Sequence, residues 1–572
     1  MFSDRKQDIL CIILLGVIFN VAASVSRPLW NRDESRYAEV GREMLELGDW
    51  VTPHLYYVPY LDKPVLNYYF VAVSYLVFGV NEFAARVSAG IWGVLSGVLT
   101  YLIGLRFYSR RAAFVAGLLL LTAMEHAILS TFITIDMALT FFVLLSFYCL
   151  FRYFFDGEDG VGGQRYSARF GRLFAGVLSL SMLLKGPISL ILVGWPLFLY
   201  VVWRRPWEAL RRFPYFSGIL IFVLIQLPWH LAIYTQTPEY FYYFYYTRNF
   251  KAFFDSSIHH GDVWYAILLY LLSGFMPWSF LFIFALVRRF RSSRRWEDKE
   301  LLLYLWLGGD VLFLTLSASK LPTYVLPLLP CLAIISGGLF ENLSFHRWER
   351  GVWYVFLALL LLLPGVAWFS QFYFLPSLDQ LPVEFVGLIY ALVGLVVLAF
   401  GAVGGIYFLR RGRDWEFFWV FFGGYFLMLL VGFYSLQFFS GIRSSKRVCK
   451  KLERVLRPGD RVFLFHNRDY AALFYLRRRI PHIGALGEIT YGARLRPSRD
   501  YFLSFEDVPP LLRDRSRRVY ILAFWKDFRT RFQRLYSHLP YVIVYRYGNF
   551  LLLSNQPLEG GGDGSGKDGV EG

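Results

Sequence analysis

The stretch that decides the fold runs from Trp30 to Pro64 and reads WNRDESRYAEVGREMLELGDWVTPHLYYVPYLDKP. It is dense in acidic and basic residues, although the whole chain is 56% hydrophobic and only 18% charged. Apolar residues recur at helical spacing from Tyr37 to Leu47, opposite the charges, which predicts an amphipathic helix lying along a bilayer surface. Asp33 stands just before this pattern, where a carboxylate can cap the free N–H groups of the first helical turn.

Outside this stretch, the chain consists largely of apolar runs long enough to cross a bilayer. The mean hydropathy is +0.44, and a hydrocarbon core of about 30 Å needs about 20 apolar residues per helix. The run at 9–25 has no small-residue cleavage site after it, so we interpret it as a first span rather than a signal peptide. The sequence therefore predicts a polytopic α-helical membrane protein with thirteen spans: 8–26, 82–107, 112–131, 135–155, 170–185, 187–203, 214–234, 264–287, 301–318, 322–340, 352–374, 384–409 and 416–439.

The arginines set the orientation of these spans. With the N-terminus inside, every arginine-rich connection, including 288–295 and 410–413, falls on the cytoplasmic side, as the positive-inside rule requires. The run at 65–79 is too short to span comfortably, and counting it as a span would place all these arginines outside. We therefore interpret it as a half-buried continuation of the first outer loop. The loop containing Asp33 then lies outside.

The pattern changes after residue 440. Helices at 443–457 and 469–478, and strands at 461–465, 519–524, 541–545 and 549–553, predict a small soluble α/β domain at 441–556 on the outer side. Its strongly basic composition suits a surface beside anionic lipid headgroups, and its outer location argues against nucleic acid. Residues 1–440 form the predicted transmembrane domain, with a catalytic first loop at 27–81, and the glycine-rich segment 557–572 is a predicted disordered tail.

Unusual residues gather on the same outer face. They include Asp136, Lys185 followed by Gly186-Pro187, the His259-His260 pair, and Lys320 before Leu321-Pro322. Each of them alone is compatible with an ordinary loop residue in contact with water. Together they predict a site in a cavity at the outer face.

Several of these motifs resemble a known family. DESRYAEVGREMLELGDW (33–50), PYLDKP (59–64), LLKGP (183–187), LPWHLAIY (227–234) and SKLPTY (319–324) resemble the bacterial lipid A aminoarabinose transferases over residues 27–340. These enzymes belong to the glycosyltransferase C superfamily and are related to protein O-mannosyltransferases. The resemblance implies a multi-pass protein of the inner (cytoplasmic) membrane with an outer α/β domain. It also implies a sugar donor on undecaprenyl phosphate, a lipid A-type glycolipid acceptor, and no nucleotide cofactor.

The resemblance also implies roles for individual residues. Asp33 and Asp136 match the catalytic carboxylates, and Lys63 matches the lysine that contacts the lipid phosphate. The other candidate substrate-binding residues are Tyr60, Tyr324, Lys185, Lys320, Arg36 and Arg248, although Arg36 could instead pair with neighbouring carboxylates. The family can hold a zinc ion through a glutamate and a histidine, which would correspond here to Asp62 and His259, with His260 as the alternative. Asp62 is one methylene shorter than that glutamate, and this departure puts the metal in doubt.

Residue chemistry agrees with glycosyl transfer. Cleavage of a sugar–phosphate bond develops negative charge on phosphate, which needs fixed cations, and positive character at the anomeric carbon, which a carboxylate eases. If the acceptor is a hydroxyl, Asp33 would act as general base; if it is a phosphate, Asp33 would position it or balance charge. Transfer to a protein or another glycan is the alternative enzyme. A transporter is disfavoured because we find no internal repeat and the polar residues collect at one face.

The predicted orientation can be tested by labelling. Cysteines introduced beside Asp33 and Lys63 should react with a membrane-impermeant thiol reagent added outside, whereas a cysteine within 288–295 should react only after permeabilisation. Reaction of the first two only from the cytoplasmic side would contradict the outer-face assignment.

Overall fold

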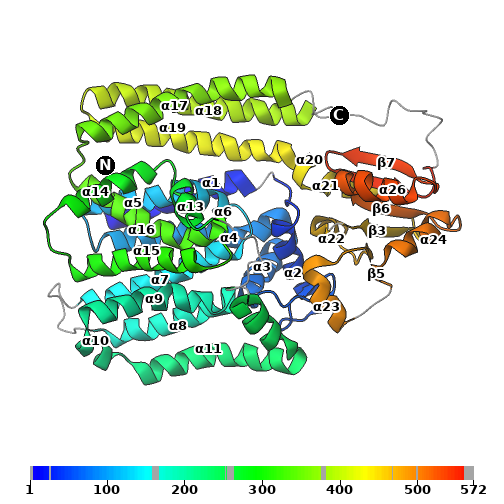
Figure 1. Ribbon diagram of the computed structural model, residues 1–572, viewed down its shortest axis with the longest axis horizontal. Helices are drawn as coiled ribbons and strands as arrows, with labels where there is room; N and C mark the ends of the chain where they lie inside the picture. Colours follow the sequence, from blue (N-terminus) through cyan, green and yellow to red (C-terminus); the bar gives the residue numbers. More distant parts are fainter. Residues whose placement is uncertain are drawn as a thin grey trace. The chain divides into compact units, whose positions relative to one another are not determined.

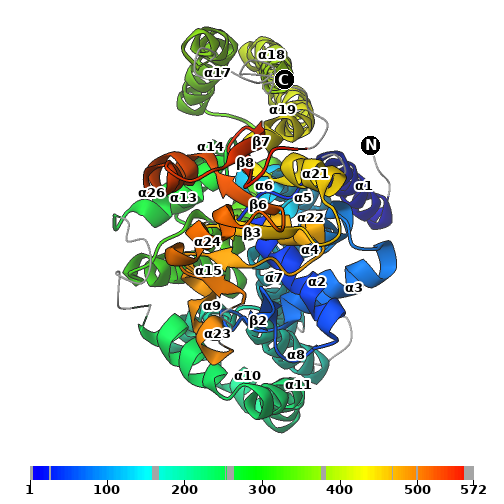
Figure 2. The same ribbon diagram turned by 90° about the vertical axis from the view of Figure 1, so that its right-hand side faces the viewer.

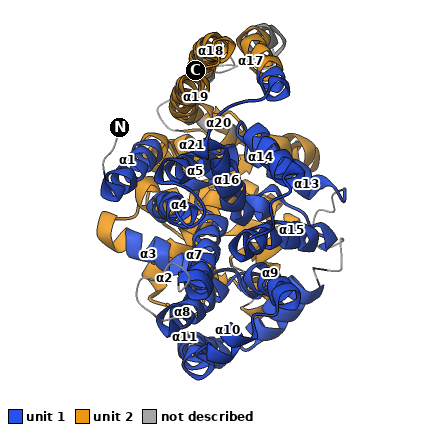
Figure 3. Cartoon of the chain, turned by 90° about the vertical axis from the view of Figure 1, so that its left-hand side faces the viewer, with its two compact units in different colours: residues 1–21, 61–74, 86–353 blue, residues 22–60, 75–85, 354–572 orange. Residues whose placement is uncertain are grey.

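The computed structural model describes residues 4–24, 27–156, 166–251, 253, 263–374, 382–466, 468–496 and 500–558. The chain forms two compact units, shown in different colours in Figure 3. The first comprises residues 1–21, 61–74 and 86–353, and the second comprises residues 22–60, 75–85 and 354–572.

The first unit is helical, because long apolar segments can satisfy their backbone polar groups internally only as helices in a bilayer. Helices α7, α8 and α11 lie side by side, and α15 packs against α9 (Figure 1). The elements that contribute to this unit are α1 (Arg5–Ser24), α3 (Leu66–Phe78), α4 (Glu82–Gly104), α5 (Arg110–Thr122), α6 (Met124–Ser130), α7 (Ile135–Phe155), α8 (Ala168–Lys185), α9 (Ile188–Arg204), α10 (Trp207–Arg212), α11 (Tyr215–Gln236), the π-helix η2 (Phe241–Lys251), α13 (Ala266–Gly274), α14 (Ser279–Arg291), α15 (Asp298–Leu316), the 3₁₀ helix η3 (Pro322–Leu328), α16 (Leu329–Gly337), the 3₁₀ helix η4 (Gly338–Glu341) and the start of α17 (Arg347–Phe374).

The number of spans differs from the expectation. In the described residues, eight helices are long and apolar enough to cross a membrane, and two bent pairs raise the number to ten. The bent pairs are α5 with α6, at 63°, and α13 with α14, at 112°. Each predicted span falls on a helix, but α8, α9 and α15 do not meet the criterion for a full span. The multi-pass helical class is thus confirmed, whereas the count of thirteen is not.

The second unit contains the predicted α/β domain together with the first-loop helix. Figure 2 shows its sheet, formed by β3 to β8. The elements of this unit are α2 (Asp33–Leu47), β1 (His54–Leu55), β2 (Val58–Pro59), most of α17, α18 (Pro382–Arg410), α19 (Asp414–Ser435), η6 (Leu436–Phe439), α20 (Ser440–Arg443), α21 (Lys446–Val455), β3 (Arg461–Phe465), α22 (Tyr470–Leu476), β4 (His482–Ile483), η7 (Gly487–Ile489), α23 (Thr490–Leu495), β5 (Phe502–Leu503), η8 (Phe505–Asp507), α24 (Val508–Arg513), β6 (Val519–Phe524), α25 (Trp525–Asp527), the π-helical turn η9 (Phe528–Phe532), α26 (Gln533–Tyr536), β7 (Val542–Tyr547) and β8 (Phe550–Ser554).

The six strands are ordered β5-β4-β3-β6-β8-β7. β3 pairs in parallel with β4 and with β6, β4 pairs in parallel with β5, and β8 joins β6 and β7 antiparallel. β3 and β6 are buried almost along their whole length, as expected for central strands covered on both faces. One face packs on α24, η9 and α26. The four longer strands were predicted from the sequence, whereas β4 and β5 were missed because each is only two residues long.

The first-loop helix is not the amphipathic surface helix that its spacing predicts. In α2 the apolar residues Tyr37, Val40 and Met44 are buried, although Leu47 is 43% exposed. Several charged residues are buried as well, including Glu34, Glu39 and Glu43. The helix packs against α22. The alternative interpretation of Asp33 as a plain helix cap is not supported, because Asp33 is the first helical residue and Arg32 occupies the cap position with φ of 79°.

Hydrogen bonds connect the segment before α2 to the α/β domain within the second unit. The backbone N–H of Asn31 donates to the carbonyl of Arg443 at 2.6 Å, and the Asn31 side chain donates to Asp469 at 2.9 Å. Ser445 donates to the same carboxylate oxygen of Asp469 at 2.9 Å. Asp469 therefore links the first loop to two elements of the domain that lie far along the chain.

A buried ion pair fixes the start of α2. The guanidinium of Arg27 donates to both oxygens of Glu34, at 3.1 and 3.0 Å, and both side chains are almost completely excluded from solvent. The backbone N–H of Trp30 donates to Glu34 as well, at 3.0 Å. Removal of one partner would leave a buried charge without compensation.

Glu34→Gln should therefore lower the free energy of unfolding by about 3–5 kcal/mol, measured by chemical or thermal unfolding of the purified protein. The matched control is Glu46→Gln, since Glu46 pairs with Arg42 but is 43% exposed, so the loss should be about 1 kcal/mol or less. Equal losses in the two variants would contradict the special role of the Arg27–Glu34 pair.

Candidate active site

A cavity of about 130 Å³ in the first unit is lined by many of the residues singled out from the sequence. Lys63 lies between β2 and α3, and Asp136 lies in the first turn of α7, at the end of the helix expected to face outward. Lys185 is the last residue of α8, which stops there because Gly186 adopts a positive φ of 79° before Pro187. The helix ends thus bring polar side chains to one place. The lining residues are Lys63, Asp136, Leu139, Lys185, Ile188, Leu192, Arg248, Asn249, Phe253, Phe313, Leu314, Ser317, Ser319, Thr323, Tyr324 and Pro327.

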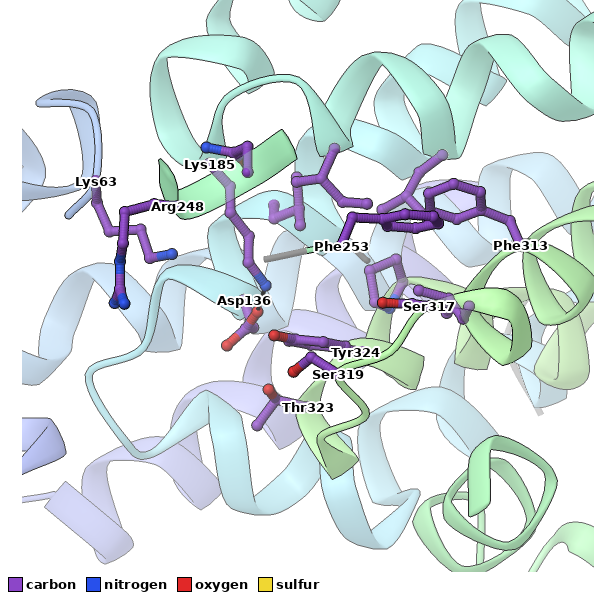
Figure 4. A pocket seen from close by; sticks show the side chains of 16 residues that line it. Lys63, Asp136, Lys185, Arg248, Phe253, Phe313, Ser317, Ser319, Thr323 and Tyr324 are labelled. Atoms are coloured by element: carbon purple, nitrogen blue, oxygen red, sulfur yellow. Dashed lines mark hydrogen bonds and ion pairs between the residues drawn. The ribbon is translucent and has the colours of Figure 1, made fainter. Parts of the chain in front are cut away.

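Three cations share this cavity, and two of them are held by carboxylates. Lys185 forms an ion pair with Asp136, toward which it points in Figure 4, and its ammonium lies 4.8 Å from the ring centroid of Tyr324. Arg248, from η2, forms an ion pair with the buried carboxylate of Asp62 at 2.5 Å. Among the described residues, Lys63 has no carboxylate at ion-pair distance. Lys63 is therefore the cation most available to an incoming anion.

The surroundings of Lys63 disfavour its charged form. Burial, followed by the positive charge of Lys185, lowers the pKa of Lys63 from 10.5 to about 8, and Arg248 adds to this effect. An anion bound between the three cations would reverse the effect, because it would stabilise the ammonium. Phosphate, with several acceptor oxygens, is the kind of group that such a cluster accommodates.

The opposite end of the cavity is apolar. The rings of Phe253 and Phe313 stack at 5.4 Å between centroids, on the side away from Lys63 and Arg248 in Figure 4. Leu192 and Leu314 also line the cavity. The cavity thus offers a cationic end for an anion and an apolar, aromatic end for a hydrocarbon or the face of a sugar ring.

Other predicted residues lie in the second unit, around Glu488. Arg36 pairs with Glu488 at 2.5 Å and with Asp33 at 3.1 Å, so the expectation that it contacts carboxylates is confirmed. Tyr60 donates to Glu488 at 3.5 Å. Burial raises the pKa of Glu488, but Arg36 and a hydrogen bond from Tyr470 outweigh it and hold the pKa below its usual value. Asp33 has a 79% exposed side chain, which leaves it accessible to a reactant.

The structure adds residues that the sequence reasoning did not single out. The polar residues Ser317, Ser319, Thr323 and Asn249 also line the cavity. Ser319 and Thr323 lie within the SKLPTY motif, so the motif itself was the available signal. Lys320 from the same motif is buried and donates to the carbonyl of Ser317 at 2.8 Å, and it does not belong to the lining.

The described residues do not form a metal site. Both oxygens of Asp62 are already engaged, one by Arg248 and the other by the hydroxyl of Tyr243 at 2.7 Å. Within the described ranges, no three His, Cys, Asp or Glu side chains are grouped so as to hold a metal ion. His259 and His260 lie outside the described residues, so the zinc expectation stays a prediction. Asp62 instead positions Arg248.

Comparisons with known proteins support the family resemblance. Residues 9–244 match the family model for dolichyl-phosphate-mannose-protein mannosyltransferase. The chain is 32% identical over 327 residues to an undecaprenyl phosphate-alpha-4-amino-4-deoxy-L-arabinose arabinosyl transferase of Aeromonas hydrophila, over 56% of this chain and 58% of that protein. It is 31% identical over 337 residues to the protein of the same name from Pseudomonas aeruginosa, over 59% of this chain and 60% of that one. The match thus spans about 58–60% of the length of these relatives.

The fold is also known. The crystal structure of ArnT from Cupriavidus metallidurans bound to undecaprenyl phosphate superimposes with a TM-score of 0.80 at 22% identity, covering 97% of this chain and 99% of that one. Its apo form gives a TM-score of 0.78. The resemblance predicted from the motifs is therefore confirmed: the chain is related to the aminoarabinose transferases and shares their fold.

Titration of Lys63 should make anion binding depend on pH. Because the pKa of Lys63 is about 8 in the free protein, affinity for a dialkyl phosphate should fall by about tenfold between pH 7 and pH 9, as the ammonium deprotonates. Lys63→Arg should remove this dependence, because a guanidinium stays charged throughout the range. Calorimetric titration of the purified protein would measure both. A pH-independent affinity in the wild type, or a preserved tenfold fall in Lys63→Arg, would contradict this role.

Proposed function

We propose that the chain is an integral-membrane glycosyltransferase that moves a sugar, aminoarabinose or a related one, from undecaprenyl phosphate to lipid A or a similar glycolipid. The reaction would take place at the outer face of the bacterial inner membrane. The observation that carries the proposal is the cavity in which Lys63, Lys185 and Arg248 converge beside an aromatic end. The names of the similar proteins supply the donor and the sugar.

The cations would serve the leaving group. In the reaction the bond between the anomeric carbon and the phosphate oxygen breaks, and undecaprenyl phosphate leaves with the electron pair. The developing negative charge would be stabilised by Lys63, Lys185 and Arg248, which are already positioned. Asp62 and Asp136 hold two of these cations in place, so little reorganisation is needed when the charge appears.

The carboxylate of Asp33 would serve the acceptor. Its side chain is 79% exposed, which leaves it accessible to a second substrate, and Arg36 contacts it at 3.1 Å. With a hydroxyl acceptor, Asp33 would take the proton as the new bond to the anomeric carbon forms. With a phosphate acceptor, the nucleophile is already anionic, and Asp33 would orient it. We propose single displacement with inversion, by analogy with the family.

The alternative is transfer of the same kind of sugar to a protein or another glycan. The match of residues 9–244 to the protein mannosyltransferase model supports this alternative. Both functions need the same donor chemistry, so the acceptor distinguishes them. Mass spectrometry of lipid A from cells with and without the gene would show an added sugar in the first case only.

Transfer from a synthetic undecaprenyl-phosphate sugar, measured in membranes that contain lipid A, tests the proposal directly. Wild type should transfer the sugar, and Asp33→Asn should lower turnover by about 100-fold or more, the usual contribution of a positioned acid–base group. The fold should persist, because an exposed ion pair such as Asp33–Arg36 contributes about 1 kcal/mol or less.

Glu453→Gln is the matched control, since this exposed carboxylate lies in α21 of the same unit and should leave turnover unchanged. If the wild type transfers sugar to no glycolipid, the proposed function is contradicted. Full turnover in Asp33→Asn would remove Asp33 from the catalytic machinery.

A further inference from the structure

A second cavity, of about 190 Å³, lies entirely within the second unit. Its lining residues are Arg32, His466, Arg468, Ala485, Gly487 and Asp527. None of them was singled out from the sequence, and the proposed reaction does not use them. Their placement follows from the topology of the sheet.

The cavity lies where the parallel part of the sheet changes direction. From β3 the chain moves outward to β4 and β5, and then returns to the other side of β3 to form β6. Such a switch point leaves a crevice beyond the carboxyl ends of the two central strands, and ligands of open α/β sheets bind there. His466 directly follows β3, and Asp527 lies three residues after the end of β6 at Phe524. The cavity therefore occupies the position at which this fold most often holds a ligand.

Two glycines after β4 make room for the charged side chains. A Cβ on Gly487 would lie 2.5 Å from a terminal nitrogen of Arg468, and a Cβ on Gly484 would lie 3.0 Å from Nδ1 of His466. Both glycines have positive φ, of 57° and 98°, which other residues adopt with difficulty. The backbone thus approaches Arg468 and His466 more closely than a side chain would allow.

Two other residues of the cavity hold unfavourable backbone conformations. His466 has φ of 54°, and Arg32 has φ of 79° with ψ of −75°. Such conformations are unfavourable for residues that carry a side chain, and they persist only where the surroundings fix them. For Arg32 the fixing contacts are the two hydrogen bonds of its neighbour Asn31 to Arg443 and Asp469. Strain of this kind gathers at binding sites.

The chemistry of the cavity suits an anion. Its lining includes two arginines, Arg32 and Arg468, and one carboxylate, Asp527. The ion pair of Arg468 with Glu488 is long, at 3.8 Å. The Nδ1 atom of His466 is enclosed and has no hydrogen-bond partner among the described residues. Arginine guanidinium groups are matched to phosphate, to which they donate two parallel hydrogen bonds.

We propose that this cavity binds a phosphate group of the glycolipid acceptor. Arg32 and Arg468 would donate to the phosphate oxygens, and His466 would complete the site. The inference rests on the proposed function for the identity of the acceptor. It goes further, because it assigns the α/β domain a direct part in acceptor recognition.

The position of Arg32 gives this site a consequence for the reaction. Arg32 directly precedes Asp33, so a phosphate held by Arg32 would bring the rest of the acceptor to the start of α2. Asp33 would then meet the acceptor atom to which the sugar is transferred. The strained backbone of Arg32 is explained if it directs the Arg32 side chain into the cavity and leaves the side chain of Asp33 exposed.

Equilibrium binding of a water-soluble diglucosamine bisphosphate to the full-length protein in nanodiscs tests the inference without any need for turnover. Arg468→Gln and Arg32→Gln should each weaken binding by about tenfold, the loss expected for one charge-assisted contact. Arg454→Gln, on the exposed side of α21 in the same unit, should bind as the wild type does. Thermal unfolding of each variant would verify that it is folded.

Three results would overturn the inference. Unchanged binding in both Arg468→Gln and Arg32→Gln would show that the cavity does not bind the acceptor. If the phosphate-free disaccharide binds equally tightly, the phosphate is not the group that the cavity recognises. If inorganic phosphate alone binds equally tightly, the cavity is a site for the free ion instead. Binding that behaves as expected in a protein that transfers no sugar would contradict the proposed function and leave the site intact.

Discussion

The burial of Lys63 beside two other cations is the constraint on which the first cavity depends. Lys63, Lys185 and Arg248 lie close enough to influence one another, and like charges in a partly buried site are costly. Asp136 and Asp62 compensate Lys185 and Arg248. Among the described residues Lys63 has no such partner, and its pKa is lowered first by burial and then by the charge of Lys185. The cavity is therefore built to be stabilised by an anionic ligand.

The same logic explains why the first loop is buried rather than laid on a surface. A helix with as many charged residues as α2 can be enclosed only if each charge finds a partner. Glu34 has Arg27, and Glu39 accepts from Arg42 at 2.8 and 2.6 Å. Burial, and next to it the charge of Glu39, raises the pKa of Glu43, whose carboxylate also accepts from a backbone N–H of Tyr57. These contacts fix the loop that presents Asp33 and Arg32.

The sequence predicted correctly those features that depend on residues close together in the chain. Long apolar runs indicated the helices, and helix-breaking residues at their ends brought Lys63, Asp136, Lys185 and Tyr324 to one cavity. The burial of α2 could not be predicted, because the helix that packs against it, α22, lies more than four hundred residues later in the chain. The second cavity was missed for a similar reason. His466 and Asp527 come together only through the strand order, and no spacing in the sequence contains that order.

The two cavities use carboxylates in the same way, and this bears on what they can bind. In each, an arginine that could hold phosphate contacts an acidic residue, closely for Arg248 with Asp62 and loosely for Arg468 with Glu488. A carboxylate partner orients the guanidinium before the ligand arrives, which lowers the reorganisation that binding requires. It also competes with the ligand, so a weakly charged group gains little by replacing water there. A phosphate, with more charge and more acceptor oxygens than a neutral sugar, can overcome that competition. If the two cavities bind phosphate as proposed, their selectivity depends on the acidic residues as much as on the basic ones.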